Sequence, residues 1–142
     1  MRRDDEGSTL LLTIFYGMLG LLLVLLVVAA TSLYLERKRL FTLADGAALA
    51  GAEAHLAPDA VAGASGPPTS LSHAAVVAAV DGYLASAPTA GFEGLALEHA
   101  GTIDGRSATV TLSAYWRPPM VTLLIPEGLR LEVTSSSRSV FY

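Results

Sequence analysis

One uninterrupted apolar run dominates the hydrophobic pattern of this chain. Residues 10–35 are 26 consecutive positions without a charged side chain. A helix rises ~1.5 Å per residue, so the run is about 39 Å long and exceeds the ~30 Å hydrocarbon core of a bilayer. The pattern predicts a transmembrane helix over residues 10–35, preceded by a short tail over residues 1–9. A cleaved secretory signal is the alternative, because Arg2 and Arg3 precede the run and residues 29–32 are small. Signal h-regions have only ~7–15 residues, which favours a retained anchor.

The helical pattern continues beyond the apolar run. Residues 36–56 contain no proline and consist mainly of Ala, Leu, Glu, Arg and Lys, which are good helix formers. We therefore predict a helical stalk over residues 36–56, joined directly to the span. Residues 57–70 are rich in Pro, Gly, Ala and Ser, a composition typical of a loop.

The remaining segment, residues 71–142, predicts a small α+β domain. Thr69 or Ser70 is expected to cap a helix over residues 71–86. Its apolar stripe includes Val76, Val77, Val80, Tyr83 and Leu84. Alternating apolar and polar residues then indicate an antiparallel hairpin and a third strand that begins at Leu129. The expected fold class is thus a helix packed on a sheet of three or slightly more antiparallel strands.

The dipeptide Asp104-Gly105 predicts a two-residue turn between the first two strands and so fixes their register. On the apolar face the predicted pairs are Leu95 with Ala114, Leu97 with Leu112, and His99 with Val110. On the polar face they are Ala96 with Ser113, Glu98 with Thr111, and Ala100 with Thr109. Trp116 has the parity of the apolar face, which the helix is expected to cover.

A second, shorter apolar run, residues 120–125, lies between Pro119 and Pro126. We expect it to be a buried short helix or strand that completes the core. The alternative is an exposed patch that contacts a partner.

Composition narrows the classes of function. Beyond residue 40 the chain has four Arg against nine Asp and Glu, so no basic stripe is available for nucleic acid. The chain has no Cys, which excludes disulfides and thiolate chemistry. His55, His73 and His99 are scattered, and no nucleophile elbow, phosphate-binding loop or metalloprotease motif occurs. We therefore expect no enzymatic activity, cofactor, metal site or small-molecule substrate.

Two groups of stalk residues are candidates for interactions. Small residues gather on one helical face, which either meets a partner helix or packs on the protein's own sheet; they are Ala44, Ala47, Ala48 and Gly51. Asp45 is a charge among apolar residues, interpreted either as a solvated flank or as part of an assembly contact. A second group is expected to anchor the helix at the lipid headgroups; it consists of Tyr34, Arg37, Lys38 and Arg39.

The stalk pattern resembles that of the Tad (Flp) pilus-assembly proteins of the TadE/TadG-like type over residues 1–54. Tyr34, Arg37, Lys38, Leu40, Ala44-Asp45 and residues 47–52 stand in matching places. Gly46 departs from the usual Ala or Ser, and Thr42 with Leu43 replaces a polar residue followed by Ala. Pilin-like members are cut after a Gly and carry Glu five residues later, whereas Gly7 is here followed by Leu12. The N-terminus is therefore expected to stay uncleaved.

The resemblance implies a pilin-like architecture in the bacterial plasma membrane, with the N-terminus cytoplasmic and the C-terminal domain outside. Charge alone does not orient the span, because Lys and Arg are nearly balanced across it. The implied role is a minor pilin or assembly protein, with the bilayer, other pilin-like subunits or assembly-platform proteins as partners. The alternative is a signal-anchored extracytoplasmic binding domain unrelated to pili, which a ligand pocket lined by polar groups would favour.

Overall fold

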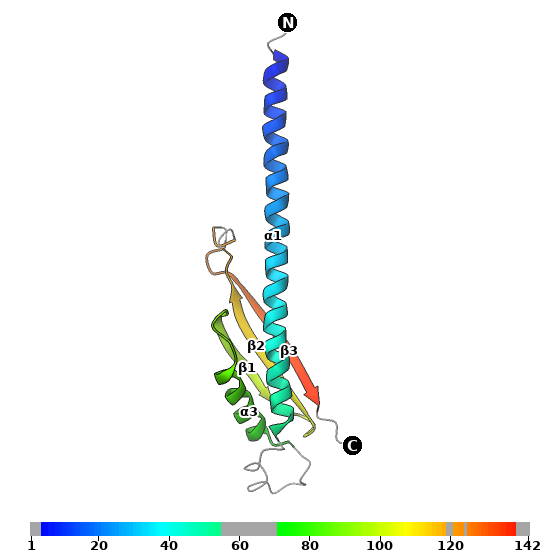
Figure 1. Ribbon diagram of the computed structural model, residues 1–142, viewed down its shortest axis with the longest axis vertical. Coiled ribbons are helices and arrows are strands. Elements are labelled where there is room, and N and C mark those ends of the chain that lie inside the picture. The colour runs from blue at the N-terminus through cyan, green and yellow to red at the C-terminus, as the bar shows by residue number, and fades with distance from the viewer. Residues whose placement is uncertain (1–3, 55–70, 119–120, 124, 139–142) are drawn as a thin grey trace. The chain divides into compact units, whose positions relative to one another are not determined.

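The computed structural model describes residues 4–54, 71–118, 121–123 and 125–138. The elements follow the order α1 (Asp4–Ala52), α3 (His73–Ser86), β1 (Glu93–Gly101), β2 (Ser107–Trp116) and β3 (Leu129–Arg138), as Figure 1 shows. The predicted α+β class with a long N-terminal helix and a three-stranded antiparallel sheet is confirmed. Compact packing divides the chain into two units, Met1–Tyr34 and Leu35–Tyr142.

The first unit contains the apolar part of α1. Its large apolar side chains are exposed, among them Leu11, Phe15, Leu22 and Val28. An 18-residue window of α1 has a mean hydropathy of 2.7, and α1 is long enough to cross a membrane. It is therefore a candidate membrane span. The α-helix ends at Ala52 rather than at the predicted residue 56, which lies outside the described residues.

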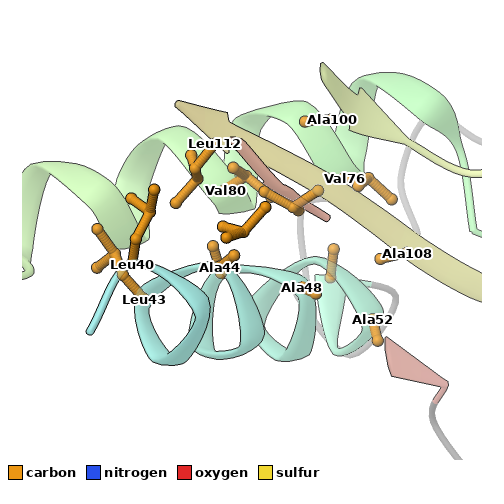
Figure 2. Close-up of a cluster of buried hydrophobic side chains, with 14 of the residues drawn as sticks. Leu40, Leu43, Ala44, Ala48, Ala52, Val76, Val80, Ala100, Ala108 and Leu112 are labelled. Atoms are coloured by element: carbon orange, nitrogen blue, oxygen red, sulfur yellow. The ribbon is translucent and has the colours of Figure 1, made fainter. Parts of the chain in front are cut away.

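The second unit is built on the sheet, whose strand order is β1-β2-β3. The C-terminal part of α1 and the whole of α3 lie side by side over one face of this sheet (Figures 1 and 2). Their buried side chains form one core with those of the strands. The largest fully buried members are Leu40, Val76, Val80, Val110 and Leu112. The segment predicted as a stalk is thus, from residue 36 to residue 54, part of the folded domain.

Helix α3 begins two residues later than predicted. The hydroxyl of Ser72 caps it by accepting a hydrogen bond of 3.1 Å from the backbone N–H of Ala75. The expected caps, Thr69 and Ser70, lie outside the described residues. The helix ends at Ser86 as predicted, directly before Ala87-Pro88.

The register of the hairpin agrees with the prediction at two pairs, Leu97 with Leu112 and Ala96 with Ser113. An irregularity between Leu97 and His99 then shifts the pairing by one residue. His99 pairs with Thr111 and is exposed, and Ala100 pairs with Val110 and is buried. The predicted pairs of His99 with Val110, Glu98 with Thr111 and Ala100 with Thr109 were therefore wrong, because a bulge puts two residues of β1 opposite one of β2.

A second irregularity, between Glu93 and Ala96, removes the predicted pair of Leu95 with Ala114. The turn also differs from the prediction, because β1 ends at Gly101 and β2 begins only at Ser107. Asp104 organises this loop: its carboxylate accepts hydrogen bonds from the backbone N–H groups of Arg106 (2.9 Å) and Ser107 (2.7 Å).

Strand β3 pairs with β2 without interruption, from Trp116 with Leu129 to Ser107 with Arg138. Its predicted alternation is confirmed, since Val133 is buried whereas Arg130 and Glu132 are exposed. The apolar run at 120–125 differs from its main prediction. Its described residues form a turn, and Leu123 is 81% exposed. This exposure fits the alternative of an exposed patch; Met120 and Leu124 lie outside the described residues.

Candidate functional site

The small residues of α1 lie in the protein's own core. Ala44 and Ala48 point into the core (Figure 2). Neither they nor Ala47 have any exposed surface, and Gly51 is also buried. A methyl group on Gly51 would lie 3.0 Å from Cβ of Ala108 on β2 and 3.1 Å from Cγ1 of Val76 on α3. This placement is the second of the two alternatives for this face, packing on the domain itself. Contact with a partner through these residues would require the core to open, and their role in assembly stays a prediction.

Gly46 departs from the family pattern for a reason that the sequence alone does not reveal. The phenol of Tyr83 on α3 lies where a side chain at position 46 would begin, and a Cβ there would be 2.7 Å from Cζ of Tyr83. An Ala or Ser at this position would force Tyr83 to move. The glycine therefore allows the last turn of α3 to pack close to α1.

The outer face of α1 carries Asp45 between two exposed apolar residues. Phe41 and Leu49 stand one helical turn before and after Asp45, and they are 48% and 49% exposed. The carboxylate of Asp45 accepts a hydrogen bond of 2.9 Å from the hydroxyl of Ser135, a buried residue of β3. We call Phe41, Asp45 and Leu49 the outer strip. It is accessible on the folded domain, whereas the small-residue face is not.

The predicted anchor residues are all exposed, with Tyr34 in the first unit and Arg37, Lys38 and Arg39 in the second. The ion pairs among the described residues join Arg117 to Glu93 and Arg130 to Glu98 and Glu132. Within that part of the chain, none of the three cations of the anchor is therefore neutralised by a carboxylate.

Sequence reasoning missed a groove of about 480 Å³ in the second unit. One wall is a single face of α1 with helical spacing, formed by Leu35, Lys38, Arg39, Thr42 and Leu43. The other wall comes from the end of α3 and the following linker, with Tyr83, Pro88, Gly91 and Phe92. The spacing on α1 is visible in the sequence. It does not indicate that the linker, some forty residues later in the chain, closes the opposite side.

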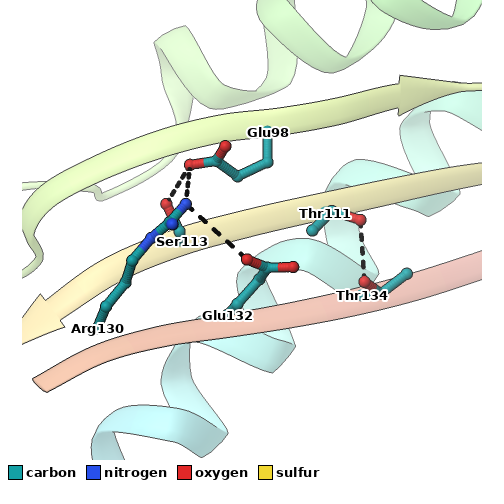
Figure 3. A network of polar contacts seen from close by, with 6 residues as sticks. All are labelled: Glu98, Thr111, Ser113, Arg130, Glu132 and Thr134. Atoms are coloured by element: carbon teal, nitrogen blue, oxygen red, sulfur yellow. Dashed lines mark hydrogen bonds and ion pairs between the residues drawn. The ribbon is translucent and has the colours of Figure 1, made fainter.

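The sheet face that the helices leave uncovered bears a polar network (Figure 3). The carboxylate of Glu98 accepts hydrogen bonds from the hydroxyl of Ser113 (2.6 Å) and the guanidinium of Arg130 (2.7 Å). These two bonds hold the pKa of Glu98 below its usual value. Thr111 and Thr134 share a hydrogen bond of 2.9 Å on the same face. The side chain of Glu98 thus ties β1 to β2 and β3.

The described residues contain no group of three or more His, Asp or Glu that could hold a metal ion. His73 packs against Gly101, where a Cβ would lie 2.6 Å from Cε1 of the imidazole, and His99 stands exposed on β1. His55 lies outside the described residues. What distinguishes the second unit is therefore its surfaces on α1: the outer strip, the three cations and the groove.

Apart from the second wall of the groove, those surfaces lie in one segment that is similar to a known family. Residues 7–54 match the family model described as "Putative Flp pilus-assembly TadE/G-like". The resemblance to Tad pilus-assembly proteins is thereby confirmed for this segment. No match was found among curated proteins or among solved structures.

The Tad segment contains most of the candidate interaction residues. It includes the small-residue face, the outer strip, the three cations and the α1 wall of the groove. The opposite wall of the groove, from Tyr83 to Phe92, lies beyond the match. The family match supports a role connected with a pilus.

Proposed function

We propose that this protein is a membrane-anchored, pilin-like accessory protein of a Tad/Flp-type pilus or a related secretion apparatus, and that it acts by protein–protein assembly. The observation that carries the proposal is the match of residues 7–54 to the pilus-assembly family. The candidate membrane span in the same helix supports it. We further propose a single span in the bacterial plasma membrane, an uncleaved N-terminus in the cytoplasm and the domain outside.

In this proposal the two faces of α1 have different roles. The inner face, with Ala44, Ala47 and Ala48, fixes the domain to the helix that carries the apolar run. The outer strip is free to meet a neighbouring subunit. Exposed apolar side chains beside a charge are a common composition for the centre and rim of a protein contact. We therefore assign the assembly contact to Asp45 and its neighbours, Phe41 and Leu49.

Asp45 has an internal hydrogen bond, so its test needs a variant that removes this bond and keeps the charge. Asp45→Asn removes the surface charge, whereas Ser135→Ala removes the hydroxyl donor and leaves the carboxylate in place. Both variants are expressed as full chains in cells that assemble the pilus. Piliation and co-purification of pilin and platform proteins are then measured.

We expect Asp45→Asn to lower co-purification and piliation at normal abundance in the membrane, and Ser135→Ala to leave both near the wild-type level. Equal losses in the two variants would assign Asp45 a structural role only. Normal piliation when the whole chain is deleted would refute the pilus function itself.

The alternative of an unrelated binding domain gains no specific support. A ligand pocket lined by polar groups would favour it, whereas the groove is walled mainly by Leu35, Leu43, Tyr83, Pro88 and Phe92.

A further inference from the structure

The groove between α1 and the linker after α3 has the features of a lipid site. We propose that it binds one anionic phospholipid of the membrane that α1 enters, with the phosphate against Lys38 and Arg39 and the glycerol and upper acyl segments along the apolar walls. The inference rests on the proposed membrane anchoring and does not depend on the identity of any pilus partner.

The walls of the groove match both parts of such a molecule. Lys38 and Arg39 stand on the α1 wall beside Leu35, and Leu43 and Phe92 supply apolar surface. Basic side chains with apolar stems are suited to a place where hydrocarbon meets headgroup phosphate. Arginine adds a planar set of donors that fits two phosphate oxygens at once.

The positive charge of the groove favours an anionic lipid over a zwitterionic one. Within the described residues no carboxylate lies in ion-pair distance of Lys38 or Arg39. The residues that line the groove include no acid. Its net charge is therefore positive, and a phosphate without a compensating amine is the complementary ligand.

In the sequence, the groove directly follows the proposed membrane span. Its α1 wall begins at Leu35, the last residue of the uncharged run. Residue Glu93, directly after the linker, pairs with Tyr115, so the linker and the end of β2 lie at the same end of the sheet. The connection from β2 to β3 starts at that end and exposes Leu123 to 81%. This end of the domain thus presents apolar groups as well as cations, as a surface in contact with headgroups requires.

The size of the groove can be compared with that of a helix of another subunit. A helix with its side chains is about 10–12 Å wide and rises ~5.4 Å per turn, so one turn alone fills roughly 500 Å³. The groove offers about 480 Å³ in total. A groove of this size suits a headgroup with the adjoining part of a lipid, whereas a helix could enter it only with one of its faces.

Three variants and a matched control test the site on the purified full chain in detergent. Lys38→Ala and Arg39→Ala each remove one cation of the groove. Gly91→Leu adds a bulky side chain to the lining of the groove, where a Cβ on Gly91 meets no atom within 4 Å and the φ of residue 91 is not positive. Arg37→Ala is the control, because it removes one cation of the same cluster that does not line the groove. Binding of phosphatidylglycerol and of phosphatidylcholine is measured by native mass spectrometry, and Trp116 fluorescence reports that each variant is folded.

We expect the wild type to bind phosphatidylglycerol more tightly than phosphatidylcholine. Lys38→Ala and Arg39→Ala should each lower the affinity for phosphatidylglycerol roughly fivefold. Gly91→Leu should abolish the bound lipid, and Arg37→Ala should leave binding nearly unchanged. An equal loss in Arg37→Ala, no effect of Gly91→Leu, or no preference for phosphatidylglycerol would each overturn the proposal.

The result of the lipid-binding test is independent of the result of the test for the pilus function. Lipid binding to the purified chain is measured without any pilus component, so it stands or falls independently of piliation. If the groove variants lose capture of a pilus subunit while lipid binding is unchanged, the occupant is a protein segment. The lipid proposal then fails and the proposed function stands.

Discussion

Replacing Gly51 by Leu separates the two interpretations of the small-residue face. Gly51 is buried on α1, between Ala108 of β2 and Val76 and Val80 of α3. Gly82 is the matched control, because it also lies within a helix, is exposed, and its Cβ would meet nothing within 4 Å. Both substitutions make the same chemical change in the same kind of element.

The expected magnitudes follow from these surroundings. Either change gains up to ~1 kcal/mol of helix propensity. At position 51 the first added carbon would already lie 3.0, 3.1 and 3.3 Å from three carbons, inside the ~3.5–4.0 Å optimum. The three further carbons of Leu find no open space, so overpacking should approach ~3 kcal/mol. Gly51→Leu should thus lose about 2 kcal/mol net, and Gly82→Leu should gain up to about 1 kcal/mol.

Thermal unfolding of the full chain in detergent measures the difference. Trp116 is the chain's one tryptophan and is 7% exposed, so its fluorescence reports on the core. A difference of ~3 kcal/mol between the variants corresponds to roughly 12–24 °C in melting temperature for a domain of this size. Equal melting temperatures would refute close packing at Gly51. Equal stability together with lost co-purification of pilus subunits would instead assign this face to a partner.

Two further predictions concern the sheet and its loop. Leu112→Ala should destabilise the domain by ~2–5 kcal/mol, whereas Leu49→Ala on the outer strip should change stability by less than ~0.5 kcal/mol; comparable losses in melting temperature would contradict the assigned core. Backbone N–H groups of Arg106 and Ser107 lower the pKa of Asp104 from 3.8 to about 2. Its stabilising effect is present above pH 3.8 and lost as the pH falls toward 2, so Asp104→Asn should flatten the decline of melting temperature in that range. If the melting temperature of Asp104→Asn falls with pH as steeply as that of the wild type, the hydrogen bonds to the Asp104 carboxylate do not stabilise the domain.

The sequence predicted the helices and strands well, but it predicted the pairing register of the strands only in part. The apolar run and the alternation after Leu129 depend on local periodicity, which is readable without a structure. The bulge before His99 is not indicated by the local periodicity; beyond it Ala100 is buried and Gly101 lies against His73 of α3. The predicted two-residue turn was wrong for a related reason: the side chain of Asp104 binds the backbone of a longer loop.

The candidate interaction residues illustrate a different limit. Small residues on a helical face indicate only that another backbone comes close, and the backbone can belong to the same chain or to another. Residues 35–43 carry half of the groove within one helical face, yet its other half is formed by Tyr83 and the linker to Phe92. The departure of Gly46 from the family pattern is explained only by the fold, because the phenol of Tyr83 occupies the space where a side chain at position 46 would begin.

The core shared between α1 and the sheet has a consequence for how this domain is made and released. The family match ends at residue 54, but cooperative folding does not divide there, because Leu40, Leu43 and Ala52 complete the core. Proteolysis near Tyr34 would release an intact folded domain. A fragment that begins after Ala54 would lack the part of the core that α1 supplies, and it would remain unfolded. During synthesis α1 emerges first, so the strands that follow must fold against a helix already in place. Maturation of the domain is thereby tied to the helix that precedes it.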